Sequence, residues 1–371
     1  MITILDTTYR EGKQSYLAHK LPDSISDYAS ILDKIGIEYI QIYHPHISDK
    51  NLKQVRSLIK QNPKVKISCH SSINLIEIEQ VIDEGITAVD LSIGLTGGKI
   101  AHQIDELEKI INHCQNKYKV SLRFRVGLEY ATKVPIEALI NVCEQLARIA
   151  PIVRISISDT DGTATPREIE KTLSKIDEIL PDRFSIEIHL HNDTGLAGAN
   201  LFKAIELFKD SKRELVIDAS AGGIGERNGI VSIGDIFSGL YLDQENTNNR
   251  KYNIRYYGEL YDFCFKDFSF DRDPLNPRAF YQSSGWHIIN FLKSGMYQHF
   301  DPVMYGQTTR LIFNEVASGD TLQIFAEKIL GKKLDKNICK QIAKEMRNYC
   351  ANNNTCLDEK SAADYISKFI P

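Results

Sequence analysis

The chain has 371 residues, of which 42% are hydrophobic and 25% are charged, and its formal net charge is -4. This is an ordinary globular composition, and the length suffices for one large domain and a smaller one. The charge gives no reason to expect nucleic acid or an anionic membrane surface as a partner, and no apolar run is long enough to span a bilayer.

The cysteines and the amino terminus point to a cytoplasmic protein. The seven cysteines are scattered and contain no Cys-x-x-Cys pair, which suits reduced thiols better than disulfides or a structural zinc site. The chain enters a strand pattern at once, without the basic start and apolar core of a signal peptide. We therefore expect a cytoplasmic location.

Short apolar runs alternate with amphipathic helical patterns from Thr3 to Ala219. The predicted strands are Thr3–Asp6, Tyr39–Tyr43, Lys66–Cys69, Ala88–Ser92, Ser121–Val126, Val153–Ile157, Ser185–His189 and Leu215–Ala219. The predicted helices between them include Ser24–Ile35, Asn51–Lys60, Leu75–Glu84, Ile104–Gln115, Pro135–Ile149, Pro166–Ile179 and Leu196–Phe208. Eight such units predict a (β/α)8 TIM barrel. A doubly wound open sheet is the alternative, but no Gly-x-Gly-x-x-Gly fingerprint follows the first strand.

The composition changes after Tyr241. Residues 244–250 are polar and are typical of a linker, and helical patterns return from about Ser283. The later predicted helices are Asp320–Leu330, Lys336–Tyr349 and Glu359–Phe369. We therefore predict a catalytic barrel over residues 1–245, followed by a linker and a mainly helical accessory region over residues 246–371.

A His-x-His pair near the end of the seventh predicted strand carries the clearest chemical signal. His189 and His191 are two residues apart, so on a strand their side chains point to the same face. Two imidazoles on one face can bind one divalent metal through neutral nitrogens. An isolated pair is more often a pair of polar strand residues. The neighbouring Glu187, Asn192 and Asp193 favour a functional role here.

Polar residues gather where the other predicted strands end, and in a barrel of this kind that rim carries the active site. Glu11 would supply a hard oxygen beside the two imidazoles, leaving coordination positions open for water and a chelating substrate. A 2-oxo acid fits, since its carboxylate and ketone oxygens can bind one metal together. Arg10 could stabilise an oxyanion or enolate nearby. A surface ion pair between Arg10 and Glu11 is the alternative.

Three motifs carry a resemblance to a known family. The stretches DTTYREGKQ (6–14), HLHNDTGLAGAN (189–200) and GIGERNGI (223–230) resemble the homocitrate synthase and 2-isopropylmalate synthase family of metal-dependent TIM-barrel enzymes. Three details are similar to the homocitrate branch: Glu11 after Arg10, Cys69-His70, and Asn228-Gly-Ile230. Isopropylmalate synthases usually carry a metal-reaching asparagine at the position of Ile230, which cannot be a ligand.

The resemblance implies an acyltransferase of amino-acid biosynthesis. Acetyl-CoA loses a methyl proton, the enolate attacks the ketone of a 2-oxo acid in a Claisen condensation, and the thioester is hydrolysed. The best single acceptor is 2-oxoglutarate. The resemblance also implies a divalent metal, either magnesium, manganese, zinc or cobalt. Its ligands would be Glu11, His189 and His191.

The resemblance assigns the remaining roles residue by residue. Arg10 matches the stabiliser of the enolate and ketone. The matching substrate contacts are Arg125 and Thr160, and His70 is a further candidate. Glu129 matches an acid that works with a histidine of the accessory region. That histidine corresponds to His287, which fits a catalytic base because its unperturbed pKa lies near working pH. Tyr297 matches a tyrosine of that region. In the family these last two residues reach the neighbouring subunit's active site, which implies a homodimer with sites completed across subunits. Without the family, spacing alone would not single out His287 or Tyr297.

The acceptor pocket departs from the family pattern. The stretch Ser92–Lys99 lacks the arginine that pairs with the distal carboxylate of 2-oxoglutarate, although Lys99 or His70 could replace it. Gly127 stands where a substrate-contacting serine is usual. The reaction class is therefore better supported than the acceptor. The alternative is a C–C lyase or aldolase of the same barrel superfamily acting on a hydroxy acid or its CoA ester. A non-catalytic descendant is a third reading, which the intact metal set disfavours.

Overall fold

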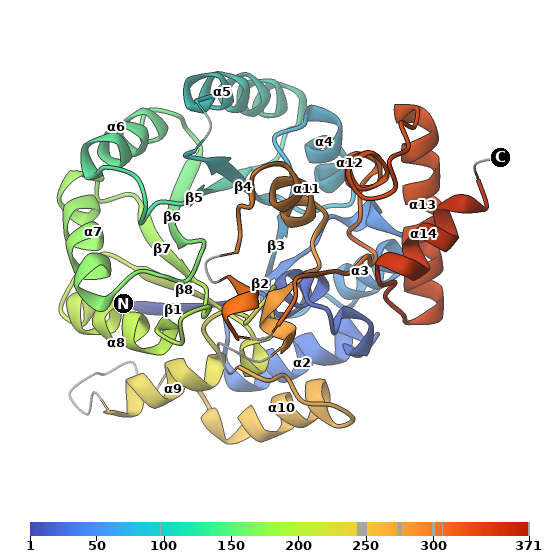
Figure 1. Cartoon of the computed structure of the whole chain (residues 1–371). Coiled ribbons are helices and arrows are strands. Elements are labelled where there is room, and N and C mark those ends of the chain that lie inside the picture. Colours follow the sequence, from blue (N-terminus) through green and yellow to red (C-terminus); the bar gives the residue numbers. More distant parts are fainter. Residues whose placement is uncertain (97, 243–250, 273–276, 299–300, 306, 370–371) are drawn as a thin grey trace.

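The computed structural model describes residues 1–96, 98–242, 251–272, 277–298, 301–305 and 307–369. Eight parallel strands close into a barrel in sequence order, which confirms the predicted TIM-barrel fold (Figure 1). The strands are β1 (Ile2–Asp6), β2 (Tyr39–Ile42), β3 (Lys66–His70), β4 (Ala88–Gly94), β5 (Arg123–Glu129), β6 (Ile152–Asp159), β7 (Ser185–Leu190) and β8 (Leu215–Ala219). The surrounding helices are α2 (Ile25–Ile35), α3 (Asp49–Gln61), α4 (Leu75–Asp83), α5 (Ile100–Lys117), α6 (Ile136–Leu146), α7 (Pro166–Ile179), α8 (Ala197–Phe208) and α9 (Ile233–Leu242).

The barrel closes because β1 pairs with both β2 and β8. In these registers Leu5 lies opposite Tyr39 on one side and Asp218 on the other. Every residue of β1 and β8 is buried, as expected for parallel strands covered by helices on the outside and by side chains on the inside. The apolar residues of the strands and of the inner helix faces form one continuous hydrophobic cluster.

Helix starts follow local capping where the sequence supplies it. Thr165 and Glu168 form a capping box on either side of Pro166, and α7 begins at Pro166 as predicted. Pro135 instead caps α6, which begins at Ile136. Helix α5 begins at Ile100, a full turn before the predicted Ile104. The prediction missed this first turn because it adds no fully buried apolar residue to the periodic pattern.

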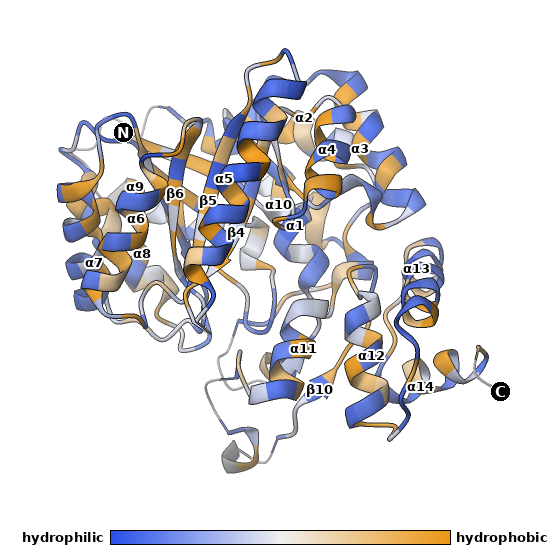
Figure 2. Ribbon diagram, turned by 90° about the horizontal axis from the view of Figure 1, so that it is seen from above, coloured by the Kyte–Doolittle hydropathy of each residue, from blue (hydrophilic) through white to orange (hydrophobic). Residues whose placement is uncertain are grey.

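Most of the chain beyond the barrel is helical, as predicted, and α11 to α14 gather at one end of the barrel (Figure 2). The elements are α10 (Tyr257–Phe265), α11 (Gly285–Ser294), α12 (Gly319–Lys328), α13 (Lys336–Asn353) and α14 (Glu359–Ser367), with the short parallel strands β9 (Tyr281–Gln282) and β10 (Arg310–Leu311). Helices α11 to α14 enclose a second hydrophobic cluster, which includes Phe313 and Phe325. In contrast, α10 packs beside α2 and joins the barrel cluster.

The predicted division at residues 245 and 246, and the whole of the predicted linker 244–250, lie outside the described residues. The separation into two domains therefore stays a prediction. Within the described ranges, no helix combines the length and apolar character needed to cross a bilayer.

Polar contacts also fix the accessory helices to the barrel rim. Lys13, after β1, forms a largely buried ion pair with Glu315. The Asn314 side chain donates to the main-chain carbonyl of Lys13 at 3.1 Å. The two regions thus meet at the carboxyl ends of the strands, where the candidate site lies.

Replacing Phe313 with Ala tests whether the second cluster folds as a unit of its own. Phe313 is fully buried, and its ring centroid lies 4.8 Å from that of Phe325. We expect a loss of about 3–5 kcal/mol of unfolding free energy. Hydrogen exchange should accelerate across α11 to α14 and stay slow in the barrel strands. The control Phe202→Ala, at a side chain that is 39% exposed, should change little. Equal acceleration in the barrel would contradict a separate unit.

Candidate active site

A cavity of about 710 Å³ opens at the carboxyl ends of the strands. All ten residues predicted for the site line it: Arg10, Glu11, His70, Arg125, Glu129, Thr160, His189, His191, His287 and Tyr297. They come from the barrel rim and from the region after it. The structure therefore brings every candidate into one pocket.

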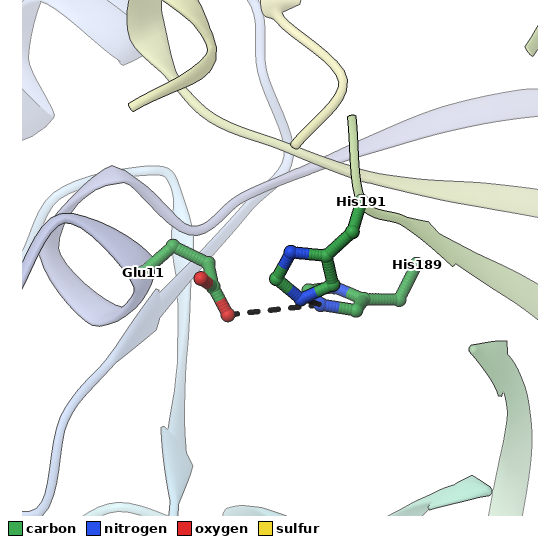
Figure 3. Close-up of side chains that lie close together, drawn as sticks. All are labelled: Glu11, His189 and His191. Atoms are coloured by element: carbon green, nitrogen blue, oxygen red, sulfur yellow. Dashed lines mark hydrogen bonds and ion pairs between the residues drawn. The ribbon is translucent and has the colours of Figure 1, made fainter. Parts of the chain in front are cut away.

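Two histidines and a carboxylate converge on one side of this pocket (Figure 3). Glu11 ends the short helix α1 (Thr8–Glu11) after β1, while His189 lies in β7 and His191 follows it. The Nε2 atom of His189 lies 3.7 Å from Oε1 of Glu11 and 3.2 Å from Nε2 of His191. One donor atom from each residue falls within 4.8 Å of the others, as metal ligands must.

The protonation states suit a metal ligand set. The Nδ1 atom of His189 donates to Oδ2 of Asp218 at 2.8 Å, which leaves Nε2 with its lone pair. Burial, assisted by the charge of Arg227, lowers the pKa of His191 well below its usual value, so this ring is neutral. Among the described residues, Glu11 Oε2 and His191 Nδ1 are buried without a hydrogen-bond partner. A carboxylate beside two neutral imidazoles fits a divalent cation.

Asp218 is a site residue to which the sequence reasoning gave no role. Burial alone would raise its pKa, but the hydrogen bond and charge of His189 and the charge of Arg125 outweigh burial, and the pKa is lowered. The residue is therefore an anionic acceptor that orients His189. Its position in the register, opposite His189 of the neighbouring strand, is the signal that could have identified it.

The two arginines at the centre of the pocket have carboxylate partners. Arg10 pairs with Glu11, and both side chains are largely buried, so the alternative of a surface ion pair is wrong. Arg125 extends from β5 and donates from Nε to Glu187 of β7 at 2.8 Å. Most of its hydrogen-bonding capacity is thus used inside the barrel. Thr160 accepts the main-chain N–H of Tyr130 at 2.8 Å, and its hydroxyl proton can point into the pocket.

His287, Tyr297 and Glu129 form a connected group on the accessory side. The rings of His287 and Tyr297 stack at a centroid distance of 3.9 Å, and the Tyr297 hydroxyl donates to Glu129 at 3.3 Å. Nη1 of Arg227 lies 3.1 Å from Nδ1 of His287. A guanidinium can only donate, so Nδ1 accepts and the neutral imidazole carries its proton on Nε2. Burial lowers the pKa of His287 and raises that of Glu129.

The glycine-rich loop after β8 fastens the accessory segment to the pocket. Glu226 is fully buried and accepts the main-chain N–H of Ser283 at 2.6 Å, just before α11. Gly229 has a φ of +76°, and a Cβ there would lie 2.0 Å from the carbonyl oxygen of Gly223. Only glycine fits this close approach, which explains the repeated glycines of the motif.

The placement of His287 and Tyr297 bears on the expectation that they complete a site across subunits. Both line the pocket of their own chain, held there by Arg227 and Glu129. The loop after β8 binds the segment that leads into α11, through Glu226 and the main chain of Ser283. The single chain thus supplies both residues to its own pocket, and the homodimer with sites completed across subunits stays a prediction.

Comparison with known proteins gives consistent relatives. The HMGL-like family model matches residues 1–260. The homocitrate synthase of Pyrococcus abyssi is 25% identical over 338 residues, which cover 88% of this chain and 90% of that protein. The mitochondrial homocitrate synthase of Schizosaccharomyces pombe is 28% identical over 70% of this chain and 61% of its own length. A 2-isopropylmalate synthase of Pseudoalteromonas atlantica is 27% identical over 79% of this chain and 58% of its own length.

Solved structures share the architecture. The HMG-CoA lyase of Bacillus subtilis superposes with a TM-score of 0.56 at 21% identity, covering 70% of this chain and 91% of the lyase. The carboxyl transferase domain of Rhizobium etli pyruvate carboxylase gives a TM-score of 0.59 at 13% identity, covering 98% of this chain and 61% of that chain. At these identities the likeness shows the fold alone.

Asp218→Asn tests the orientation of His189. The neutral amide accepts a weaker hydrogen bond than the carboxylate, so we expect affinity for Mn²⁺ or Zn²⁺ to fall about 10- to 100-fold in calorimetric titration. Glu214→Gln is the matched control, because this carboxylate accepts from Thr3 and Ser185 at the opposite end of the barrel. Unchanged metal affinity in Asp218→Asn would remove the orienting role.

Proposed function

This chain belongs to the HMGL-like family, and on that premise we propose that it is an acyltransferase that condenses acetyl-CoA with a 2-oxo acid. One observation carries the proposal: Glu11, His189 and His191 face the same pocket as Arg10 and as the group formed by residues 129, 287 and 297. The homocitrate and isopropylmalate synthase relatives support the same reaction class.

The pocket residues divide the chemistry between two sides. A divalent cation held by Glu11, His189 and His191 would supply Lewis-acid polarisation of the acceptor ketone. Any of magnesium, manganese, zinc or cobalt suits this donor set, and availability often decides between them. Arg10 lies beside the triad, where its guanidinium can stabilise negative charge on the enolate oxygen.

Glu129 is the best-placed group to accept the methyl proton of acetyl-CoA. Burial raises its pKa, which makes its carboxylate a stronger base, and Tyr297 holds it by a hydrogen bond. His287 was expected as the base, but in the tautomer that Arg227 selects its Nε2 donates. We therefore assign His287 the donor role toward a developing oxyanion. The enolate carbon then bonds to the ketone carbon, and water hydrolyses the thioester to release CoA.

The finer assignments are part of the same proposal. We infer that the acceptor is 2-oxoglutarate, that the product is homocitrate or a close analogue, and that the enzyme works in amino-acid biosynthesis as a cytoplasmic homodimer. A C–C lyase of the same superfamily is the alternative. The accessory segment that carries His287 and Tyr297 into the pocket favours the synthase, because the lyases known to us lack such a region.

Release of free CoA tests the reaction class. With Mn²⁺ present, we expect acetyl-CoA to yield CoA with one member of a 2-oxo acid panel: 2-oxoglutarate, oxaloacetate, pyruvate, 2-oxoisovalerate, glyoxylate or phosphonopyruvate. A chelator and His189→Ala should each abolish the release, because both remove the Lewis acid. His113→Ala, at an exposed histidine of α5, is the control and should keep full activity. Chelator-resistant release, or full activity in His189→Ala, would contradict the mechanism.

Mixing two inactive variants tests how the pocket is assembled. His287→Gln should retain metal binding and lose about 10²- to 10⁴-fold in turnover, because proton transfer is impaired. Glu11→Gln should lose metal affinity. We propose that one chain supplies both residues to its own pocket, so subunit exchange between the variants should restore no activity. Recovery in the mixture would show that His287 acts across a subunit interface.

A further inference from the structure

One arginine that lines the pocket forms no ion pair with any described residue. Arg10 pairs with Glu11, and Arg125 lies against Glu187 and Asp218. Arg347, on α13, lines the same pocket but forms no ion pair within the described part of the chain. A guanidinium keeps its charge at any pH at which the protein works, so Arg347 presents to the pocket a cation that is not directly paired.

The side chain of Arg347 is held in place by the main chain of two segments. Nε donates to the carbonyl of Ile47 at 2.8 Å, and Nη1 donates to the carbonyl of Ala317 at 3.0 Å. Helix α13 lies beside α3, which fixes the helix itself (Figure 1). These bonds leave Nη2 without a partner among the described residues. The guanidinium plane is therefore preorganised, with donors left for a planar anion such as a carboxylate.

Tyr43 lines the pocket within electrostatic range of both Arg10 and Arg347. Burial raises the pKa of the Tyr43 hydroxyl to about 12, although Arg10 and Arg347 are both near enough to lower it. The neutral hydroxyl can therefore donate a hydrogen bond. The Tyr43 ring lies 6.2 Å from that of His70, whose Nδ1 is buried with no described partner. Polar groups thus continue from Arg10 toward Arg347.

We propose that Arg347 binds the distal carboxylate of a dicarboxylic 2-oxo acid whose ketone end faces Arg10 and the three metal-ligand candidates. This inference rests on the proposed function and adds to it a residue that determines the acceptor. It also accounts for the missing arginine after β4. Lys99 does not line the pocket, whereas Arg347 reaches it from a helix far along the chain.

The residues around Arg347 suit a ligand group with one negative charge better than a group with several. Glu77 lies within electrostatic range of Arg347, and Glu77, Glu106 and Asp320 all line the pocket. A diphosphate of CoA would bring several charges to a single arginine beside these acids. One carboxylate is matched by one guanidinium. The acceptor acid is therefore the occupant that we assign, and CoA is the competitor that the test must separate.

The test measures binding and turnover with a matched pair of acids. In 2-oxopentanoate a methyl group stands where 2-oxoglutarate has its distal carboxylate. Calorimetric titration of the Mn²⁺-loaded protein should give about 10- to 100-fold tighter binding of 2-oxoglutarate. Arg347→Gln should remove that preference, and Arg347→Lys should restore part of it. The variants should keep the wild-type KM for acetyl-CoA and the wild-type affinity for 2-oxopentanoate.

Arg183→Gln is the matched control. Arg183 also donates to two main-chain carbonyls, those of Ile152 and Ala147, but it precedes β7 at the far end of the barrel. It should keep the preference for 2-oxoglutarate, and melting temperatures will show whether either variant is unfolded.

Equal binding of the two acids by the wild type would overturn the inference while leaving the synthase proposal intact. A raised KM for acetyl-CoA in Arg347→Gln, with the preference kept, would overturn it in favour of CoA binding. Preferential binding without CoA release would sustain the inference and reject the synthase.

Discussion

Arg227 ties together the parts from which the pocket is built. Its guanidinium donates to both carboxylate oxygens of Asp193, at 2.6 and 2.9 Å, and to the main-chain carbonyl of Thr160 at 2.7 Å. It also contacts His287 at 3.1 Å. One buried side chain thus joins the ends of β6, β7 and β8 to α11. Its charge is matched by Asp193, so burial costs less than it would for a lone cation.

The metal-ligand candidates depend on a second buried network inside the barrel. Asp218 accepts from His189, and Arg125 lies between Asp218 and Glu187. Buried ion pairs of this kind add little net stability, because desolvation offsets much of the attraction. Their effect here is geometric. They hold His189 in one tautomer and one orientation, which a metal site requires.

The two networks also set where protons reside. Arg227 selects the His287 tautomer that donates from Nε2, and burial makes Glu129 a stronger base. In the proposed mechanism Glu129 therefore takes the role of base that was expected of His287, and His287 takes the role of donor. Neither change is visible in the residue types. Both follow from which groups the fold places against each other, since a pKa responds to desolvation and to neighbouring charges.

The sequence by itself determined the barrel and the donor types of the candidate metal site. Hydrophobic periodicity located all eight strands, and the His-x-His spacing placed His189 and His191 on one face, because both signals depend on local geometry. The sequence prediction missed the start of α5 and the whole of helix α10. In both helices the buried residues cover only part of the helix, so the apolar pattern did not mark its full length. Only the tertiary structure decided that Asp218 supports His189, that His287 enters the pocket of its own chain, and that Arg347 binds the main chain of Ile47 at the pocket wall. These contacts join residues from distant parts of the chain, so no spacing or local propensity encodes them.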